Sequence, residues 1–250
     1  MKAILLAAGK GERLGDVVRR IPKPMIPYKG KPILQHNIEL CRRHGIKQIY
    51  MNTHYLAGEI RNYFGTGERF GVHLHYSYET QLLGTSGALN SFREELGKGT
   101  FFVLYGDNFS KFNLQRLRDA MKKRNCIGVI AFHYREDVSQ SGVGEFDRDG
   151  RVTGFIEKPS PGTTSSHWVN AGIYLLNPAI LKYIPEGFSD FGRDIFPLLL
   201  RENVPLYGVR SRVSLKAFDT LELLKAAQAD DHQSAAGGDR SFAKRTSGRR

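Results

Sequence analysis

Cysteine is scarce in this sequence of 250 residues: Cys41 and Cys126 are the only two, and they lack the spacing of metal ligands. Two cysteines cannot supply the disulfide framework of a small secreted scaffold. No run approaches 18 consecutive apolar residues, and the N-terminus has no signal-peptide pattern. The sequence therefore predicts reduced thiols, no membrane partner and a cytoplasmic location.

Acidic residues are also in short supply, since 25 Asp and Glu face 37 Lys and Arg and the net charge is +12. A balance this basic raises the question of nucleic-acid binding. Part of the excess lies in residues 232–250, and the rest is spread over predicted helix faces without interleaved aromatic residues. We therefore favour a solvated surface that attracts small anionic substrates. A nucleic-acid binder that acts through the basic tail is the alternative.

The order of apolar patterns predicts an α/β fold. Short apolar runs without helical period alternate with amphipathic patterns of helical spacing, which is typical of parallel strands joined by right-handed crossovers. We expect a Rossmann-like, mostly parallel three-layer sandwich. Residues 141–147 and 151–156 flank a turn and predict an inserted β-hairpin. One domain is expected over 1–231, followed by a disordered basic tail over 232–250, where apolar periodicity is lost.

The first apolar run, residues 2–8, reads as a buried parallel strand that ends in a loop of small residues. Such a loop lets backbone N–H groups approach phosphate oxygens closely. Arg13 adds a planar guanidinium with several N–H donors. Lys23 adds a point charge, and the prolines on either side of it restrict the backbone and so help to direct the ammonium. A Gly-x-Gly alone is weak evidence, but the small-residue loop, Arg13 and Lys23 together predict a diphosphate or triphosphate ligand. Neither the Walker loop nor the dinucleotide fingerprint fits this spacing.

The string from Ala7 to Pro24 resembles the signature of the sugar-1-phosphate nucleotidylyltransferases, AxGxGxR followed by a PKP segment. The resemblance implies that Arg13 and Lys23 hold the nucleotide's phosphates and stabilise the departing pyrophosphate. It also implies nucleotide contacts from the small residues of the loop, which are Ala7, Ala8, Gly9 and Gly11.

Two further segments carry the same resemblance on the nucleotide side. Residues 79–89 look like the family's LGTxGAL segment, so Gly84 is a predicted nucleotide contact, and Gln81 and Gly87 are candidates for the base and the ribose. By itself this segment could be only a tight loop. Asp107 follows an apolar strand at 100–105 and matches the family's GD motif, which implies an Mg²⁺ ligand. A bare Gly-Asp pair is more often a turn.

On the sugar side, the resemblance covers a glycine, an EKP pair and an NAG segment. It implies that these groups face the sugar phosphate. Taken without the resemblance, Glu157 and Lys158 read as a surface ion pair. The residues concerned are Gly142, Glu157, Lys158, Asn170 and Gly172.

Residues 216–222 depart from the family's usual D-I-G-T-P-E. Alignment on Thr220 puts Ala217 where the aspartate is expected, and Asp219 stands two residues later. Related nucleotidyltransferases with an I-D-T-P-E-D string place an aspartate just before the threonine, so we assign the second Mg²⁺ ligand to Asp219. An N-cap role for Asp219 is an equally open reading.

The resemblance spans residues 1–229 and implies one reaction, in which a nucleoside triphosphate and a sugar 1-phosphate give a nucleoside diphosphate sugar and pyrophosphate, with Mg²⁺ as cofactor. Residues 16–32 and the compact length look like bacterial heptose or mannose 1-phosphate guanylyltransferases, which favours GTP slightly. The tripeptide Ala7-Ala8-Gly9 resembles the sequence at this place in uridylyl- and cytidylyltransferases of this fold. A non-catalytic nucleotide-sugar sensor is the other alternative. The sugar and a homo-oligomeric assembly stay open.

Overall fold

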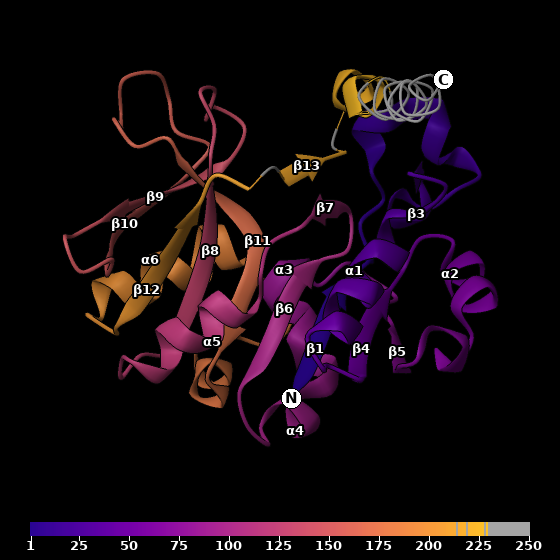
Figure 1. Cartoon of the computed structure of the whole chain (residues 1–250), viewed down its shortest axis with the longest axis horizontal. Coiled ribbons are helices and arrows are strands. Elements are labelled where there is room, and N and C mark those ends of the chain that lie inside the picture. The colour runs from indigo at the N-terminus through magenta and orange to yellow at the C-terminus, as the bar shows by residue number, and fades with distance from the viewer. Residues whose placement is uncertain (214, 219, 228, 230–250) are drawn as a thin grey trace, which may run out of the picture.

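A nine-stranded mixed sheet runs through the protein in a computed structural model that describes residues 1–213, 215–218, 220–227 and 229. At its centre, β1 (Lys2–Leu6) pairs in parallel with β4 (Gln48–Thr53) on one side and β6 (Phe101–Tyr105) on the other. Next to β4 lies β5 (His73–Tyr78), also parallel, at the sheet edge. This half of the sheet is the predicted Rossmann-like arrangement (Figure 1).

The second half of the sheet is built around β11 (Trp168–Leu176), which runs antiparallel to β6. It also pairs with β8 (Gly128–Tyr134) and with β9 (Gly142–Phe146). The hairpin of β9 with β10 (Val152–Glu157) confirms the predicted insert. Beyond β8, the parallel strand β12 (Leu206–Ser211) completes this half.

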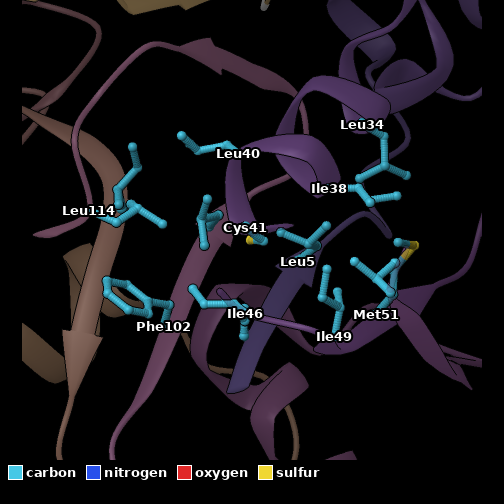
Figure 2. Close-up of a cluster of buried hydrophobic side chains, with 14 of the residues drawn as sticks. Leu5, Leu34, Ile38, Leu40, Cys41, Ile46, Ile49, Met51, Phe102 and Leu114 are labelled. Carbon is cyan, nitrogen blue, oxygen red and sulfur yellow. The ribbon is translucent and has the colours of Figure 1, made fainter. Parts of the chain in front are cut away.

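Helices cover both faces of the sheet, because successive strand residues point to opposite sides. On β1, Leu5 belongs to the core under α1, α2 and α5, whereas Ile4 belongs to the core under α4 and α6. Figure 2 shows the first of these cores, where Leu34, Ile38 and Cys41 of α1 reach down to the strands. The result is the predicted three-layer sandwich. The helices are α1 (Ile33–Arg43), α2 (Ala57–Phe64), α3 (Gly84–Gly87), α4 (Arg93–Leu96), α5 (Gln115–Lys122) and α6 (Phe196–Arg201).

Several elements differ from the sequence-based expectation. The helix expected over 190–202 begins as a π-helical turn (Phe191–Ile195) before α6, and Pro197 explains the change because it has no N–H for a regular α ladder. The helix expected over 178–184 is a 3₁₀ turn capped by the Asn177 side chain. Two small antiparallel pairs were not predicted: β2 (Pro27–Tyr28) with β3 (Lys31–Pro32), and β7 (Asn108–Ser110) with β13 (Leu215–Ala217).

The helix predicted near the C-terminus is present over 221–227. None of the helices in the described part of the chain combines the length and the apolarity needed to span a bilayer. The predicted tail, 232–250, lies outside the described residues. The 3₁₀ segments are Glu12–Arg19, Lys23–Met25, Glu68–Phe70, Ala88–Phe92 and Pro178–Tyr183.

A third apolar cluster joins the two ends of the described chain. Leu14 and Val18, from the segment after the first loop, lie in one buried cluster with Phe218 and Leu224. The ring of Phe218 stands edge-on to that of Tyr28, with the centroids 5.2 Å apart. Figure 1 shows the yellow C-terminal helix beside this indigo N-terminal segment. The first loop is therefore supported from the far end of the chain.

Replacement of Phe102 by alanine should destabilise the fold strongly. Phe102 is fully buried on β6 in the core of Figure 2, so Phe102→Ala removes apolar contacts and leaves a cavity. We expect the free energy of unfolding to fall by about 3–5 kcal/mol in urea denaturation. Phe188→Ala is the control, because Phe188 is 61% exposed and its loss should change stability by less than about 0.5 kcal/mol. Equal losses in the two variants would contradict the assigned core.

Candidate active site

A cleft of about 440 Å³ opens at the carboxyl ends of the central parallel strands. Leu6 ends β1, Asn52 lies near the end of β4, and Tyr105 ends β6, and all three line the cleft. In open α/β sheets, ligands bind at this edge. The opposite wall comes from the antiparallel half, through β8, β10 and β11.

Most of the residues singled out from the sequence line this one cleft. Those lining it are Ala8, Gly9, Arg13, Lys23, Gly84, Asp107, Gly142, Glu157, Lys158, Asn170 and Gly172. Four others, Ala7, Gly11, Gln81 and Gly87, are not among its lining residues. Asp219 lies outside the described residues. The contacts of all of these groups with a ligand stay predictions.

An ion pair between Lys23 and Asp107 crosses the cleft floor. The two side chains are 8% and 24% exposed, so the pair is largely withdrawn from water. Gly11 leaves room for it, since a Cβ at Gly11 would lie 3.0 Å from the Cβ of Lys23 and the backbone there has φ +70°. The buried Asn37 holds the turn around Asp107, because its Nδ2 donates to Gly106 O at 3.2 Å and to Asn108 O at 2.9 Å.

Two backbone N–H groups of the predicted nucleotide segments already have protein partners. The N–H of Ala7 donates to Asn52 Oδ1 at 2.9 Å, and the N–H of Gly87 donates to Ser189 O at 3.1 Å. Gly84 packs so closely that a Cβ would lie 2.4 Å from the Ser189 carbonyl oxygen, and its φ is +76°. Gly84 is thus needed for the shape of the cleft wall.

Asn52 and Glu79 are cleft residues that the motif comparison missed. Both are 3% exposed, and Asn52 Nδ2 donates to Glu79 Oε1 at 2.8 Å. The other carboxylate oxygen, Oε2, accepts the N–H of Leu83 at 3.0 Å. A chain of bonds thus connects the first loop, through Ala7, to the start of α3. The available sequence signal was a polar residue at the carboxyl end of each of two predicted parallel strands.

The wall expected to face a sugar is shaped by Gly142 and Glu157. A Cβ at Gly142 would lie 2.7 Å from Glu157 Oε2, so only glycine leaves space for this carboxylate. Burial raises the pKa of Glu157, and the cations of Lys158 and Arg193 reduce that rise. Lys158 has φ +51°, a conformation that is uncommon for a residue other than glycine. Glu157 and Lys158 both belong to the cleft lining.

His133 and Arg135 also line the cleft and were not predicted from the sequence. Both belong to or follow β8, at the end that adjoins the sugar-facing wall. Burial, assisted by the guanidinium of Arg135, lowers the pKa of His133 to about 4. The imidazole is therefore neutral near pH 7.

Asp107 is the described residue best placed to hold a metal ion. No three His, Cys, Asp or Glu side chains within the described residues form a ready metal cluster. Mg²⁺ does not need such a cluster, since it is commonly held by one or two carboxylates together with substrate phosphates and water. A carboxylate in contact with Lys23, in the same cleft as Gly9 and Arg13, fits that partial set.

Comparison with known proteins gives a consistent picture. A profile described as Nucleotidyl transferase matches residues 2–214. A UTP–glucose-1-phosphate uridylyltransferase of Synechocystis is 38% identical over 84% of this chain and 58% of its own length. A mannose-1-phosphate guanylyltransferase catalytic subunit beta of Drosophila pseudoobscura is 31% identical over 80% of this chain and 54% of its own. The chain thus spans just over half the length of these relatives.

The solved structures agree on the fold. HddC from Yersinia pseudotuberculosis, in a crystal structure with GMP-PN, superposes with a TM-score of 0.77 over 92% of this chain and 98% of its own. Its sequence identity is 23%, so this likeness concerns the fold alone.

Acidification should destabilise the protein through His133. Because its pKa is lowered on folding, its stabilising contribution is complete above about pH 6.5 and is lost as the pH falls towards 4. The unfolding free energy should drop by roughly 3 kcal/mol across this window on account of this group. Denaturant titrations at several pH values measure this pH dependence of the unfolding free energy, and the contribution of His133 should be missing in His133→Gln. His73→Gln, at an exposed position, should keep it. Identical slopes in the protein and in His133→Gln would contradict the assignment.

Proposed function

This chain belongs to the nucleotidyl transferase family, and we propose from that premise that it transfers a nucleoside monophosphate from a nucleoside triphosphate to a sugar 1-phosphate. The products are a nucleoside diphosphate sugar and pyrophosphate. The observation that carries the proposal is the convergence of Arg13, the Lys23–Asp107 ion pair, Glu157 and Lys158 on one cleft. The two groups of cations lie on opposite walls, as two anionic substrates require.

In the proposed reaction, a phosphate oxygen of the sugar 1-phosphate attacks the α-phosphorus of the triphosphate. A new P–O bond forms, and the bond from the α-phosphorus to the bridging oxygen of the β-phosphate breaks with its electron pair. The attacking oxygen is already anionic, so no general base is needed. Catalysis then consists of positioning and charge stabilisation. Arg13 and Lys23 bind the β- and γ-phosphates, and Lys158 binds the phosphate of the sugar.

Asp107 would hold Mg²⁺, with Asp219 as the proposed second ligand. When bound, Mg²⁺ supplies charge neutralisation to the reacting phosphates. The ammonium of Lys23 contacts the same carboxylate. In this proposal Asp107 therefore has a cation beside it whether or not Mg²⁺ is bound.

The sugar is proposed to lie against the wall of Gly142 and Gly172, where Glu157 accepts hydrogen bonds from its hydroxyl groups and Asn170 donates one. Support comes from the cleft position of all four residues. A cytoplasmic location, and substrates rather than nucleic acid as partners, belong to the same proposal.

Pyrophosphate release tests the proposal directly. A screen of GTP, UTP, CTP, ATP and dTTP with Mg²⁺ against several sugar 1-phosphates should give turnover with at least one pair. Lys23→Met should lower kcat by about a hundredfold or more, because removal of one preorganised donor to a phosphate typically costs about 3 kcal/mol in the transition state. Lys98→Met is the matched control, since the Lys98 side chain is 64% exposed and pairs with Glu94 just after the end of α4.

Two outcomes would contradict the proposed enzyme. Binding of a triphosphate without any pyrophosphate release across the screen would point to a non-catalytic sensor. Equal activity of Lys23→Met and Lys98→Met would remove Lys23 from the machinery.

For the base, we propose guanine, on the strength of Glu79. Its buried carboxylate lies in the cleft beside Gly84, and each of its oxygens takes one donor from the protein and has a lone pair left. Guanine offers two neighbouring N–H donors, N1–H and N2–H, that suit an acceptor-only group. Uracil offers one N–H donor between two carbonyl acceptors, which suits an amide better. The uridylyl and cytidylyl alternatives are outcomes of the test.

Glu79→Gln should shift nucleotide preference away from GTP. An amide can accept only one of the two guanine donors, so kcat/KM for GTP should fall by about ten- to a hundredfold, the usual discrimination of one paired contact. The readout is the ratio of kcat/KM for GTP to that for UTP, because a general disturbance of the Asn52 and Leu83 bonds would lower both values equally. A protein that prefers UTP before any substitution, or a ratio unchanged in Glu79→Gln, would contradict guanine recognition by Glu79.

A further inference from the structure

Two tyrosine hydroxyl groups meet between β6 and β11, beside the cleft. The hydroxyl of Tyr174 donates to that of Tyr105 at 3.1 Å, and the rings stand edge to face with centroids 5.9 Å apart. Tyr174 is fully buried, and Tyr105 lines the cleft. Burial raises the pKa of Tyr105 to about 12 and raises that of Tyr174 well above its usual value, so both hydroxyl groups keep their protons at neutral pH.

The pair belongs to a longer chain of hydrogen bonds. On one side, Asn170 Nδ2 donates to Tyr174 OH at 2.8 Å. On the other, Tyr174 OH donates to Tyr105 OH at the cleft. Three side chains, those of Asn170, Tyr174 and Tyr105, thus connect β11 to the end of β6.

The two bonds of this chain run in one direction. Asn170 Nδ2 donates to the hydroxyl oxygen of Tyr174, and Tyr174 donates its own hydroxyl proton to Tyr105. Tyr174 therefore has no proton left to donate to Asn170, and it must accept from the amide nitrogen.

The backbone of β11 requires the same orientation of the Asn170 amide. Strand β11 has a bulge between Asn170 and Tyr174, where its register against β8 shifts. Gly172 lies in this bulge with φ +63°, and a Cβ there would lie 2.6 Å from the Tyr105 ring. The N–H of Gly172 donates to Asn170 Oδ1 at 2.9 Å, so that atom must be the oxygen. The bonds of Oδ1 and of Nδ2 therefore give one orientation of the Asn170 amide.

In that orientation, Asn170 presents a donor to the cleft. One Nδ2 hydrogen goes to Tyr174, and no residue within the described ranges takes the second one. Asn170 lines the cleft together with Gly172 and Lys158. We propose that Tyr174 and Tyr105 are positioning residues that hold Asn170 as a hydrogen-bond donor towards an oxygen of the sugar 1-phosphate. This proposal rests on the proposed function of the cleft.

Tyr174→Phe tests the chain with the smallest change, since it removes one hydroxyl group and keeps the ring. We expect the KM for the sugar 1-phosphate to rise about tenfold, while kcat and the KM for the triphosphate change less than twofold. Tyr76→Phe is the matched control, because it likewise removes a bonded hydroxyl group, which donates to Gly65 O at 2.9 Å away from the cleft. Thermal unfolding of both variants shows whether any loss is one of stability.

A second measurement needs no catalysis: solvent exchange of the Asn170 side-chain amide, followed by NMR. One Nδ2 hydrogen should be protected in the unaltered protein and should lose that protection in Tyr174→Phe but not in Tyr76→Phe. An unchanged KM for the sugar 1-phosphate in an active Tyr174→Phe, or a parallel rise of both KM values, would overturn the proposal. If the unaltered protein turns over no substrate pair, the proposed function fails, and unprotected Asn170 hydrogens would then overturn the positioning chain separately.

Discussion

The contact between Lys23 and Asp107 is the interaction on which the cleft depends. It joins the proline-flanked segment after the first loop to the end of β6, two parts of the chain that are 84 residues apart. An ammonium that is 8% exposed would be destabilised by several kcal/mol without a counterion, and the carboxylate offsets that cost. The gain in net stability is small, because desolvation and attraction nearly cancel. What the pair provides is a cation held at a fixed place beside the first loop before any ligand arrives.

The support for this cation comes from both ends of the described chain. Gly11 gives its stem room, and Asn37 holds the turn that carries Asp107. Strand β13 pairs with β7 directly after Asp107, with Ala217 opposite Asn108, and Phe218 then packs into the cluster of Leu14 and Tyr28. The first loop and the Asp107 turn are therefore fixed by the same C-terminal segment, which makes that segment part of the site although few of its side chains line the cleft.

Sequence could predict the groups whose placement is local and could not predict those whose placement depends on register. Asp107 follows a buried strand directly, and Arg13 follows a glycine loop directly, so a strand prediction suffices to bring them to one edge of the sheet. Asn52 and Glu79 meet only because β4 and β5 pair with Asn52 opposite Ser77, and this register is invisible in either strand alone. The meeting of Tyr105 with Tyr174 depends in addition on a bulge in β11. The π-helical turn before α6 was also missed. The hydrophobic pattern of 190–202 fits a regular helix, and only the backbone hydrogen bonds around Pro197, which has no N–H to donate, depart from it.

The charge inside the cleft bears on how two anionic substrates could share it. Its described lining holds four permanent cations, Arg13, Lys23, Arg135 and Lys158, against three carboxylates, Glu79, Asp107 and Glu157. The net charge of +12 is therefore mostly a property of the outer surface, where each charge is screened beyond about 8 Å at physiological ionic strength. A nearly balanced cleft cannot by itself neutralise a triphosphate and a second phosphate brought into contact. The balance favours a mobile cation that enters with the substrates, and Asp107, which lines the cleft with Arg13 and Gly9, is the described carboxylate that we propose such a cation would meet.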